Sequence, residues 1–336
     1  MIWILKERNY AVTEYYFSIL KEAAEKISDD VFFVDEIDKN KCRPSSDIVI
    51  VGTVTKAIML FLKGYKNVII WFQGVCPEES YMRNKSIIRK KVLEFIEKKV
   101  LKRTKLAIFV SQAMKEHYEN KYKINIRNKY YIMPCFNTEM YKESFFKAEK
   151  YEKNIFTYTG GLSSWQGFDK IIACYENIEK LGIPNTKLLV LTPDKDQALE
   201  EIEKTSIKNY EVGYAKVEEL PSILSDVKFG FIIREDNIVN QVATPTKISN
   251  YIANGIIPIY SECIRDFHTI TSDYKYRISF DSIDFYNNIR ELMTNNINSE
   301  SIYNEYAELF SMYYNADFHI KSLSDKFRQS ILINEE

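Results

Sequence analysis

The segment FIIREDNIVNQVATPTKISNYIANGIIPIYSE, from Phe231 to Glu262, carries most of the information about the fold of this chain. It predicts an apolar strand, then a helix that Pro245 opens, and then a second strand. Parallel α/β sheets bind ligands beyond the carboxyl ends of their strands, which is where Arg234 lies. Lys247 lies in the first helical turn and opposes the helix dipole, a destabilisation that a bound anion relieves. We therefore predict that both cations bind an anionic ligand.

A second segment with the same character is YTGGLSSWQGFDK, residues 158–170. It predicts a strand that runs into Gly160 and Gly161, followed by Ser163, Ser164 and a helix. Glycines at this point allow close approach of a ligand to the backbone, and a helix N-terminus favours an anion. A tight turn with serine capping accounts for the same residues. The segment has neither the dinucleotide fingerprint nor the P-loop pattern.

Outward from these segments, apolar strands alternate with helices along the whole chain of 336 residues. Near-continuous Ile/Val runs between helices predict parallel sheets covered on both faces, and the length predicts two domains. A charged connector, Lys142–Lys153, marks the boundary. We predict an α/β protein with Rossmann-like domains at 1–145 and 146–336, the second ending in a helical tail at Ile302–Ile333. Their sheets are expected to face a central cleft, the natural ligand site.

Composition excludes several classes of protein. The 46 Lys+Arg and 47 Asp+Glu residues give a net charge of −1, which argues against a nucleic-acid partner. A hydrophobic content of 46% argues against disorder. The five cysteines form no C-x-x-C pair and fit a reducing compartment. Since neither a signal peptide nor a membrane-spanning run is evident, we expect a cytoplasmic protein.

The motif R-E-x-N-x-V-N-x-V-A-x-P-T-K-x-x-x-Y-x-A-x-G, which begins at Arg234, resembles the donor-nucleotide region of family 4 retaining glycosyltransferases. These are GT-B enzymes common in bacterial capsule and O-antigen loci. Other segments resemble the family's landmarks in the order expected, over roughly residues 65 to 265. They are WFQGVCPEES (71–80), LAIFVSQAMKEHYENKY (106–122), YIMPCFNTEMY (131–141) and the segment at 158–170.

The resemblance implies a hexosyltransferase that moves a sugar from a nucleotide-diphosphate-sugar donor to a saccharide acceptor, which we expect to be lipid-linked. It implies a catalytic role for Arg234 and Lys247 in neutralising the donor diphosphate. Gln73 and Glu78 then lie on the acceptor side. The donor-binding candidates are Gly160, Gly161, Ser163, Ser164, Glu235, Pro245, Thr246, Asn250 and, toward the nucleobase, Tyr214.

The chain departs from the family pattern at several of these positions. Gly161 and Gln166 stand where many members have diphosphate-binding Arg and Lys, and Asn250 replaces the second of two glutamates. Donor binding must then rely on Arg234, Lys247 and backbone amides near 160–164. The lost glutamate leaves open a non-catalytic nucleotide-sugar-binding partner subunit. A GT-B epimerase is a further alternative, although it needs carboxylates and histidines that converge on the sugar.

Two further expectations concern metal ions and membranes. The sequence has no D-x-D pair and its three histidines are scattered, so we predict a metal-independent enzyme without a cofactor, in which Arg and Lys replace the cation. The segment Asn84–Lys105 predicts a basic amphipathic helix with nine Lys/Arg, which can touch an anionic membrane as a peripheral contact. We expect its apolar stripe to cover the sheet. The stripe consists of Ile88, Val92, Phe95, Ile96 and Val100.

Overall fold

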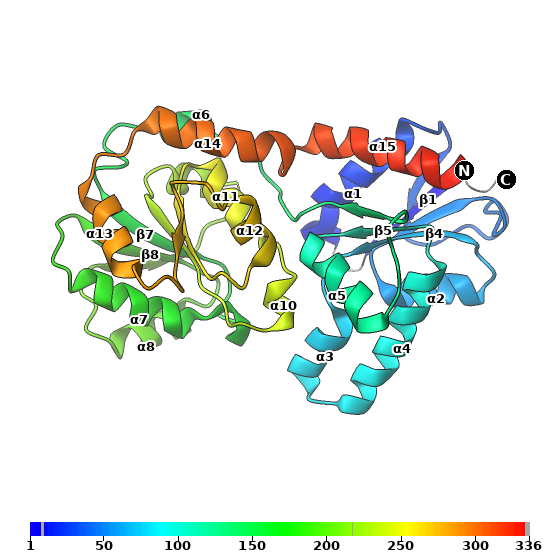
Figure 1. Cartoon of the computed structure of the whole chain (residues 1–336), viewed down its shortest axis with the longest axis horizontal. Helices are drawn as coiled ribbons and strands as arrows, with labels where there is room; N and C mark the ends of the chain where they lie inside the picture. The colour runs from blue at the N-terminus through cyan, green and yellow to red at the C-terminus, as the bar shows by residue number, and fades with distance from the viewer. Residues whose placement is uncertain (8–9, 217, 333–336) are drawn as a thin grey trace. The chain divides into compact units, whose positions relative to one another are not determined.

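The computed structural model describes residues 1–7, 10–216 and 218–332, and side chains throughout except at 10–12, 164 and 331–332. It divides into two compact units, each built on one six-stranded parallel sheet (Figure 1). Unit 1 comprises Met1–Cys135, Gln241–Thr244 and the C-terminal segment from Asn315. Unit 2 comprises Phe136–Asn240 and Pro245–Tyr314. The predicted α/β class and the two parallel sheets are confirmed.

The sheet of unit 1 is buried between two helical layers. In spatial order its strands are β2 (Val31–Val34), β1 (Ile2–Leu5), β3 (Ile48–Val51), β4 (Asn67–Phe72), β5 (Leu106–Phe109) and β6 (Tyr130–Ile132). The four inner strands are buried at every residue, as the Ile/Val runs predict. Helices α1 (Tyr10–Glu25) and α15 (Ala316–Leu332) lie on one face, opposite α2 (Val54–Leu62), α4 (Ile87–Arg103) and α5 (Gln112–Tyr122) (Figure 1).

The sheet of unit 2 has the strand order of a dinucleotide-binding Rossmann fold. In space the order is β12 (Ile278–Ser279), β11 (Ile257–Tyr260), β10 (Phe229–Ile232), β7 (Asn154–Thr159), β8 (Thr186–Leu191) and β9 (Tyr210–Gly213). The order therefore reverses between β7 and β10. The helices are α6 (Lys142–Phe145), α7 (Phe168–Glu179), α8 (Lys195–Glu203), α9 (Leu220–Leu224), α11 (Thr246–Ala253), α12 (Arg265–Ile270), α13 (Phe285–Thr294) and α14 (Ser299–Met312).

The division between the units differs from the predicted domains of 1–145 and 146–336. Unit 2 begins at Phe136, because α6 packs against α14. The expected helical tail consists of two helices, α14 and α15. Asn315 accepts a hydrogen bond from the backbone N–H of Phe318 (2.8 Å), a cap that starts α15. Since α15 packs along α1, the end of the described chain belongs to unit 1.

The basic segment Asn84–Lys105 also differs from the prediction. Helix α3 (Cys76–Asn84) ends at Lys85, which has a φ of 53°, and Ser86 caps the separate helix α4. The apolar stripe does not cover the sheet: Ile88 is 79% exposed and Phe95 64% exposed, whereas Val100 is buried. The first turns of α4 extend past the sheet beside α3, so only the last turns reach the core (Figure 1).

Helix α4 contributes a buried carboxylate that the sequence pattern does not reveal. Glu97 is fully buried and accepts hydrogen bonds from the hydroxyls of Tyr118 (3.1 Å) and Tyr122 (2.6 Å) on α5. The ammonium of Lys121 lies 3.7 Å from the same carboxylate. Burial raises the pKa of Glu97 to about 7, although these partners oppose the shift.

We expect the substitution Glu97→Gln to reduce the pH dependence of stability between pH 5 and 7. The folded-state pKa exceeds the ordinary value of 4.5, so the folded protein retains a proton that the unfolded chain releases. Stability should thus fall as the pH rises through this window, by roughly 3 kcal/mol for a shift of this size. Urea unfolding at pH 5, 6, 7 and 8 measures the effect, and parallel pH profiles for wild type and variant would contradict it.

Candidate functional site

The candidate site lies in unit 2 at the carboxyl ends of β7 and β10. These neighbouring strands flank the point at which the strand order reverses. The connections that follow them leave in opposite directions, which opens a space for ligands at this edge of the sheet. Gly160 follows β7 with a φ of +124°, and Arg234 follows β10 after a single residue. The two segments singled out in the sequence therefore meet here.

Two hydrogen bonds hold Arg234 in place, one from its backbone and one from its side chain. Its backbone N–H donates to the hydroxyl of Ser261 (3.0 Å), beyond β11. Its guanidinium Nη1 donates to the carbonyl of Trp165 (3.0 Å), in the loop between β7 and α7. Burial lowers the pKa of Arg234 from its usual value. The side chain thus holds a cation in a poorly solvated position at the strand end.

Lys247 approaches the same loop from the first turn of α11. Its ammonium donates to the side-chain carbonyl of Gln166 (3.0 Å) and lies 4.2 Å from the ring centre of Tyr158. Burial, with a contribution from Arg234, lowers the pKa of Lys247 well below its usual value of 10.5. Gln166, one of the departures from the family pattern, is therefore a neighbour of this cation.

The two cations lack a counter-charge in the part of the chain that the structure describes. No carboxylate there forms an ion pair with Arg234 or Lys247, and the charge of Arg234 contributes to the lowered pKa of Lys247. Both side chains are half-buried, and poorly solvated charges without partners are costly, so a bound anion stabilises such an arrangement. The geometry suits a phosphate or diphosphate group, which accepts several charged hydrogen bonds at once.

Hydrogen bonds to other parts of unit 2 already hold the glycine loop that follows β7. The backbone N–H of Gly160 donates to the carbonyl of Leu191 (2.9 Å), and that of Leu162 donates to the carboxylate of Asp194 (2.9 Å). Two of the amides expected to bind an anion are therefore already used. Gly161 accepts a hydrogen bond from the Tyr158 hydroxyl. The carboxylate of Asp194 therefore lies against this loop, and the positive charge of the site comes from the side chains of Arg234 and Lys247.

Two glycines that the sequence analysis passed over shape the site. Gly167 has a φ of +64°, and a Cβ there would lie 2.8 Å from the carbonyl oxygen of Ile233. A Cβ on Gly230 would lie 2.4 Å from the ring of Tyr251. The Tyr251 hydroxyl accepts a hydrogen bond from the N–H of Thr159 (3.2 Å), at the end of β7. Glycine thus permits the close packing that brings loop, strand and α11 together.

Glu235, Pro245 and Thr246 are chain neighbours of the two cations. Glu235 is exposed and its carboxylate lies 3.5 Å from the ammonium of Lys170 on α7. Pro245 precedes α11 in an extended conformation, and Thr246 is the first residue of that helix. Their places fit the predicted site, and their contact with a ligand stays a prediction.

The remaining donor-side candidates lie at the margins of this cluster. Asn250 lines a small hollow beside α9 with Tyr141 and Pro221. Tyr214 follows β9 and is exposed. Ser163 is exposed before the short 3-10 turn at Ser164–Gln166, and the side chain of Ser164 lies outside the described part. The roles predicted for these residues stay predictions.

The two acceptor-side candidates differ in exposure. Gln73 is exposed and follows β4, with its amide beside Gly52 at the end of β3. Glu78 is only 7% exposed, and its carboxylate lies 2.6 Å from the ammonium of Lys121. This contact joins α3 to α5. The burial of Glu78 favours a role in positioning helices, and its contact with an acceptor stays a prediction.

Two properties of the described residues bear on metal and membrane binding. No group of three or more His, Cys, Asp or Glu side chains among them is placed to hold a metal ion. None of the helices in residues 1–7, 10–216 and 218–332 is both long and apolar enough to cross a membrane.

Comparison with protein-family models and with curated protein sequences finds no match. Solved structures do match. An S. aureus TarM mutant in complex with fondaparinux, α-GlcNAc-glycerol and UDP has a TM-score of 0.62 at 13% identity, over 87% of this chain and 57% of TarM. A UDP-forming α,α-trehalose-phosphate synthase from Burkholderia vietnamiensis has a TM-score of 0.60 at 11% identity, over 98% and 82%. The chain has the GT-B fold.

A third GT-B structure supports the same conclusion. Sucrose-phosphate synthase from Thermosynechococcus elongatus has a TM-score of 0.61 at 13% identity, over 86% of this chain and 74% of its own. The chain spans a little over half the length of TarM. The GT-B architecture that the motifs implied is therefore confirmed. At these identities the likeness concerns the fold, and the activity is argued from the site.

Proposed function

We propose that this chain is a retaining, family 4-like glycosyltransferase that transfers a sugar from a nucleotide-diphosphate-sugar to a saccharide acceptor. The observation that carries the proposal is the convergence of Arg234 and Lys247 on one glycine loop without a carboxylate partner. The loop lies at the reversal point of a Rossmann-type sheet, where nucleotides bind in this architecture. The GT-B neighbours, one of which is named as a UDP-forming synthase, support this choice of ligand.

In the proposed mechanism the protein acts mainly through charge and position. The donor diphosphate accepts hydrogen bonds from Arg234 and Lys247, which stabilise the negative charge that develops as the glycosidic bond breaks. The leaving diphosphate helps to remove the proton of the acceptor hydroxyl, and the sugar is transferred on the same face. Holding donor and acceptor together supplies the remaining acceleration. We place the acceptor, a saccharide that we propose to be lipid-linked, on unit 1.

Two alternatives are distinguished by experiment. A non-catalytic binding subunit is favoured by Asn250, which replaces a glutamate of the family pattern. A GT-B epimerase is disfavoured because no carboxylate pairs with either cation among the described residues of the site. A thermal-shift screen of UDP, GDP, ADP and their sugar derivatives identifies the donor, since a ligand at 100 times its Kd stabilises by about 2.7 kcal/mol. Transfer or donor hydrolysis then separates an enzyme from a binding subunit.

We expect transfer to be independent of divalent metal ions. Arg234 and Lys247 supply the positive charge that a bound cation would otherwise supply to the diphosphate. Activity in excess EDTA should equal that in buffer alone, and added Mg²⁺ or Mn²⁺ should change it less than two-fold. Loss of activity on chelation, with recovery on adding either metal, would show that the two side chains do not suffice.

We propose that the enzyme works at the cytoplasmic face of the membrane in capsule or O-antigen type assembly, and that α4 makes a peripheral contact with anionic lipid. The exposed apolar side chains Ile88 and Phe95 lie on this helix together with exposed Lys91 and Lys99. Lysines near an anionic surface contribute about 1 kcal/mol each, within a Debye length. Apolar insertion and charge attraction then act on one helix.

Charge reversal of α4 should abolish sedimentation with anionic vesicles. The variant carries Lys91→Glu, Lys99→Glu and Lys102→Glu, three exposed positions. Binding by the wild type should weaken about ten-fold between low and physiological salt, as expected for several screened charges. A matched control reverses three exposed lysines of unit 2, namely Lys180, Lys187 and Lys204. Equal loss in both variants would assign the attraction to net charge instead of α4.

A further inference from the structure

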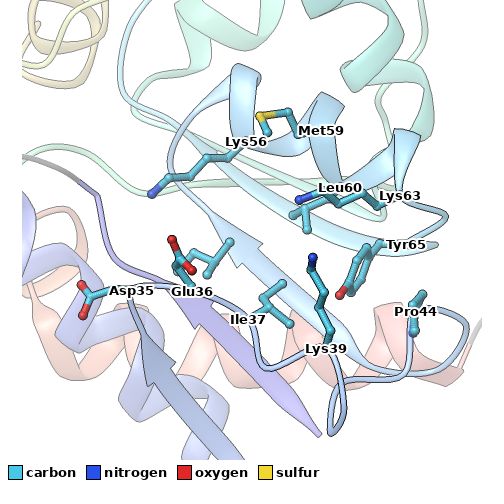
Figure 2. A pocket seen from close by; sticks show the side chains of 11 residues that line it. Asp35, Glu36, Ile37, Lys39, Pro44, Lys56, Met59, Leu60, Lys63 and Tyr65 are labelled. Carbon is cyan, nitrogen blue, oxygen red and sulfur yellow. The ribbon is translucent and has the colours of Figure 1, made fainter.

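Unit 1 contains a pocket of its own, which is separate from the cation pair of unit 2. It has a volume of about 620 Å³, within the range of pockets that hold small molecules. Its walls are α2 and the connection between β2 and β3, and the end of β1 contributes Leu5 (Figure 2). In unit 1 the strand order reverses between β1 and β3, so the pocket begins next to the place where such sheets bind ligands.

The pocket exists because a crossover lacks its usual helix. Residues 35–47, all of which the structure describes, join β2 to β3 and form turns without a helix. Parallel strands are usually joined through a helix that covers the sheet. Here the space beside α2 is covered only by this connection, which leaves an apolar wall open to solvent. The wall consists of Leu5, Ile37, Pro44, Met59 and Leu60.

The charged groups of the pocket are segregated. The ammonium groups of Lys39 and Lys63 point into one part of it, beside the ring of Tyr65, whereas the carboxylates of Asp35 and Glu36 lie at the other end (Figure 2). The hydroxyl of Tyr65 is hydrogen-bonded to the side chain of Cys42. In the described part of the chain, neither Lys39 nor Lys63 forms an ion pair. Lys56 lies toward the carboxylate end, where its ammonium lies 3.0 Å from Glu7. The end at Lys39 and Lys63 is therefore positively charged, whereas the other end carries both carboxylates and an ammonium group.

We propose that this pocket binds a phosphorylated saccharide, with the phosphate between Lys39 and Lys63. Two ammonium groups, with three donors each, match the several acceptor oxygens of a phosphate monoester. The apolar wall suits the C–H faces of a sugar, and the Asp35 and Glu36 carboxylates accept hydrogen bonds from its hydroxyls. Resting on the proposed function, the inference gives the acceptor a chemical class, a saccharide that carries a phosphate.

Polar groups at both ends favour this ligand over a lipid phosphate. An acyl chain extending from the lysines along the pocket would meet the carboxylates of Asp35 and Glu36, whose desolvation is costly. A sugar of similar length meets them with hydroxyls. Free phosphate would satisfy the lysines alone and leave the apolar wall and the carboxylates unused. The three ligands are therefore separable by binding measurements on the same protein.

The test is calorimetric binding without any donor. The probes are glucose 6-phosphate, mannose 6-phosphate and ribose 5-phosphate, their parent sugars, inorganic phosphate, and vesicles that contain phosphatidic acid. At least one sugar phosphate should bind ten-fold or more tightly than its parent sugar and than inorganic phosphate. The double variant Lys39→Ala/Lys63→Ala should weaken that binding by roughly a hundred-fold, about ten-fold for each charged contact.

Exposed Lys66, outside the pocket lining, provides the matched control, and Lys66→Ala should leave the affinity within two-fold. An unchanged unfolding midpoint in the double variant shows that its fold is intact. Three outcomes would overturn the proposal: no preference for any sugar phosphate, equal affinities in wild type and double variant, or binding to the vesicles alone. The proposed transferase function is tested independently, because nucleotide-sugar binding, which we assign to unit 2, is measured in a separate titration of the same chain.

Discussion

Replacement of Arg234 or Lys247 by alanine is expected to lower kcat/KM for sugar transfer by one to two orders of magnitude or more. Charged hydrogen bonds of this kind contribute roughly 1.5–3 kcal/mol each, and the contacts to a leaving diphosphate strengthen in the transition state. Most of the loss should therefore appear in kcat. Steady-state kinetics with the donor identified by the nucleotide screen measures both constants.

Conservative variants separate charge from shape at this site. Arg234→Lys keeps the charge but loses the fork that also holds the Trp165 carbonyl, so we expect an intermediate loss. Lys247→Met keeps the stem and loses the charge, so it should match Lys247→Ala. Lys180→Ala, at the residue that follows α7, removes an exposed cation of the same unit and should have no effect. Wild-type kinetics in both alanine variants would remove the pair from the mechanism.

The parts of the fold that local sequence determines could be predicted from it. Residues 54–62 form the helix α2, because the Thr53 side chain accepts a hydrogen bond from the backbone N–H of Lys56 (3.4 Å) and an apolar face follows. Fully apolar runs such as Ile48–Val51 could only be buried strands. Arg234 and Lys247 were found for the same reason, since their positions at a strand end and a helix start follow from local pattern.

Other features depend on contacts between distant residues. The helical tail was predicted to belong to the second domain, and only the packing of α15 along α1 assigns its second helix to unit 1. The apolar stripe of α4 was expected to cover the sheet, but helical spacing does not state how far a helix extends past its support. The pocket beside α2 arises from a helix that is missing, which no motif marks.

Gly167 shows the same limit at the donor site, and it carries the second large expected effect. The sequence suggested only a turn there. In the structure the left-handed backbone of Gly167 brings the loop against the end of β10, one residue before Arg234. A non-glycine residue in this conformation costs about 1–2 kcal/mol. A Cβ 2.8 Å from the Ile233 carbonyl adds a steric cost, since backbone cannot move aside as a flexible side chain can.

We therefore expect Gly167→Ala to destabilise unit 2 by about 2–5 kcal/mol, the sum of the conformational cost and an overpacking cost of about 1–3 kcal/mol. Gly182 is a matched control, because its φ of +69° is similar and a Cβ there would have no neighbour within 4 Å. Gly182→Ala should show the conformational cost alone, about 1–2 kcal/mol. Urea unfolding of both variants yields the difference, which isolates the contact with Ile233. Gly167 lies two residues after Trp165, whose carbonyl accepts a hydrogen bond from Arg234, so Gly167→Ala should also weaken nucleotide binding while Gly182→Ala leaves it unchanged. Equal destabilisation by the two substitutions would mean that the loop can move away from β10, and the cation pair would then lack the rigid support argued for it.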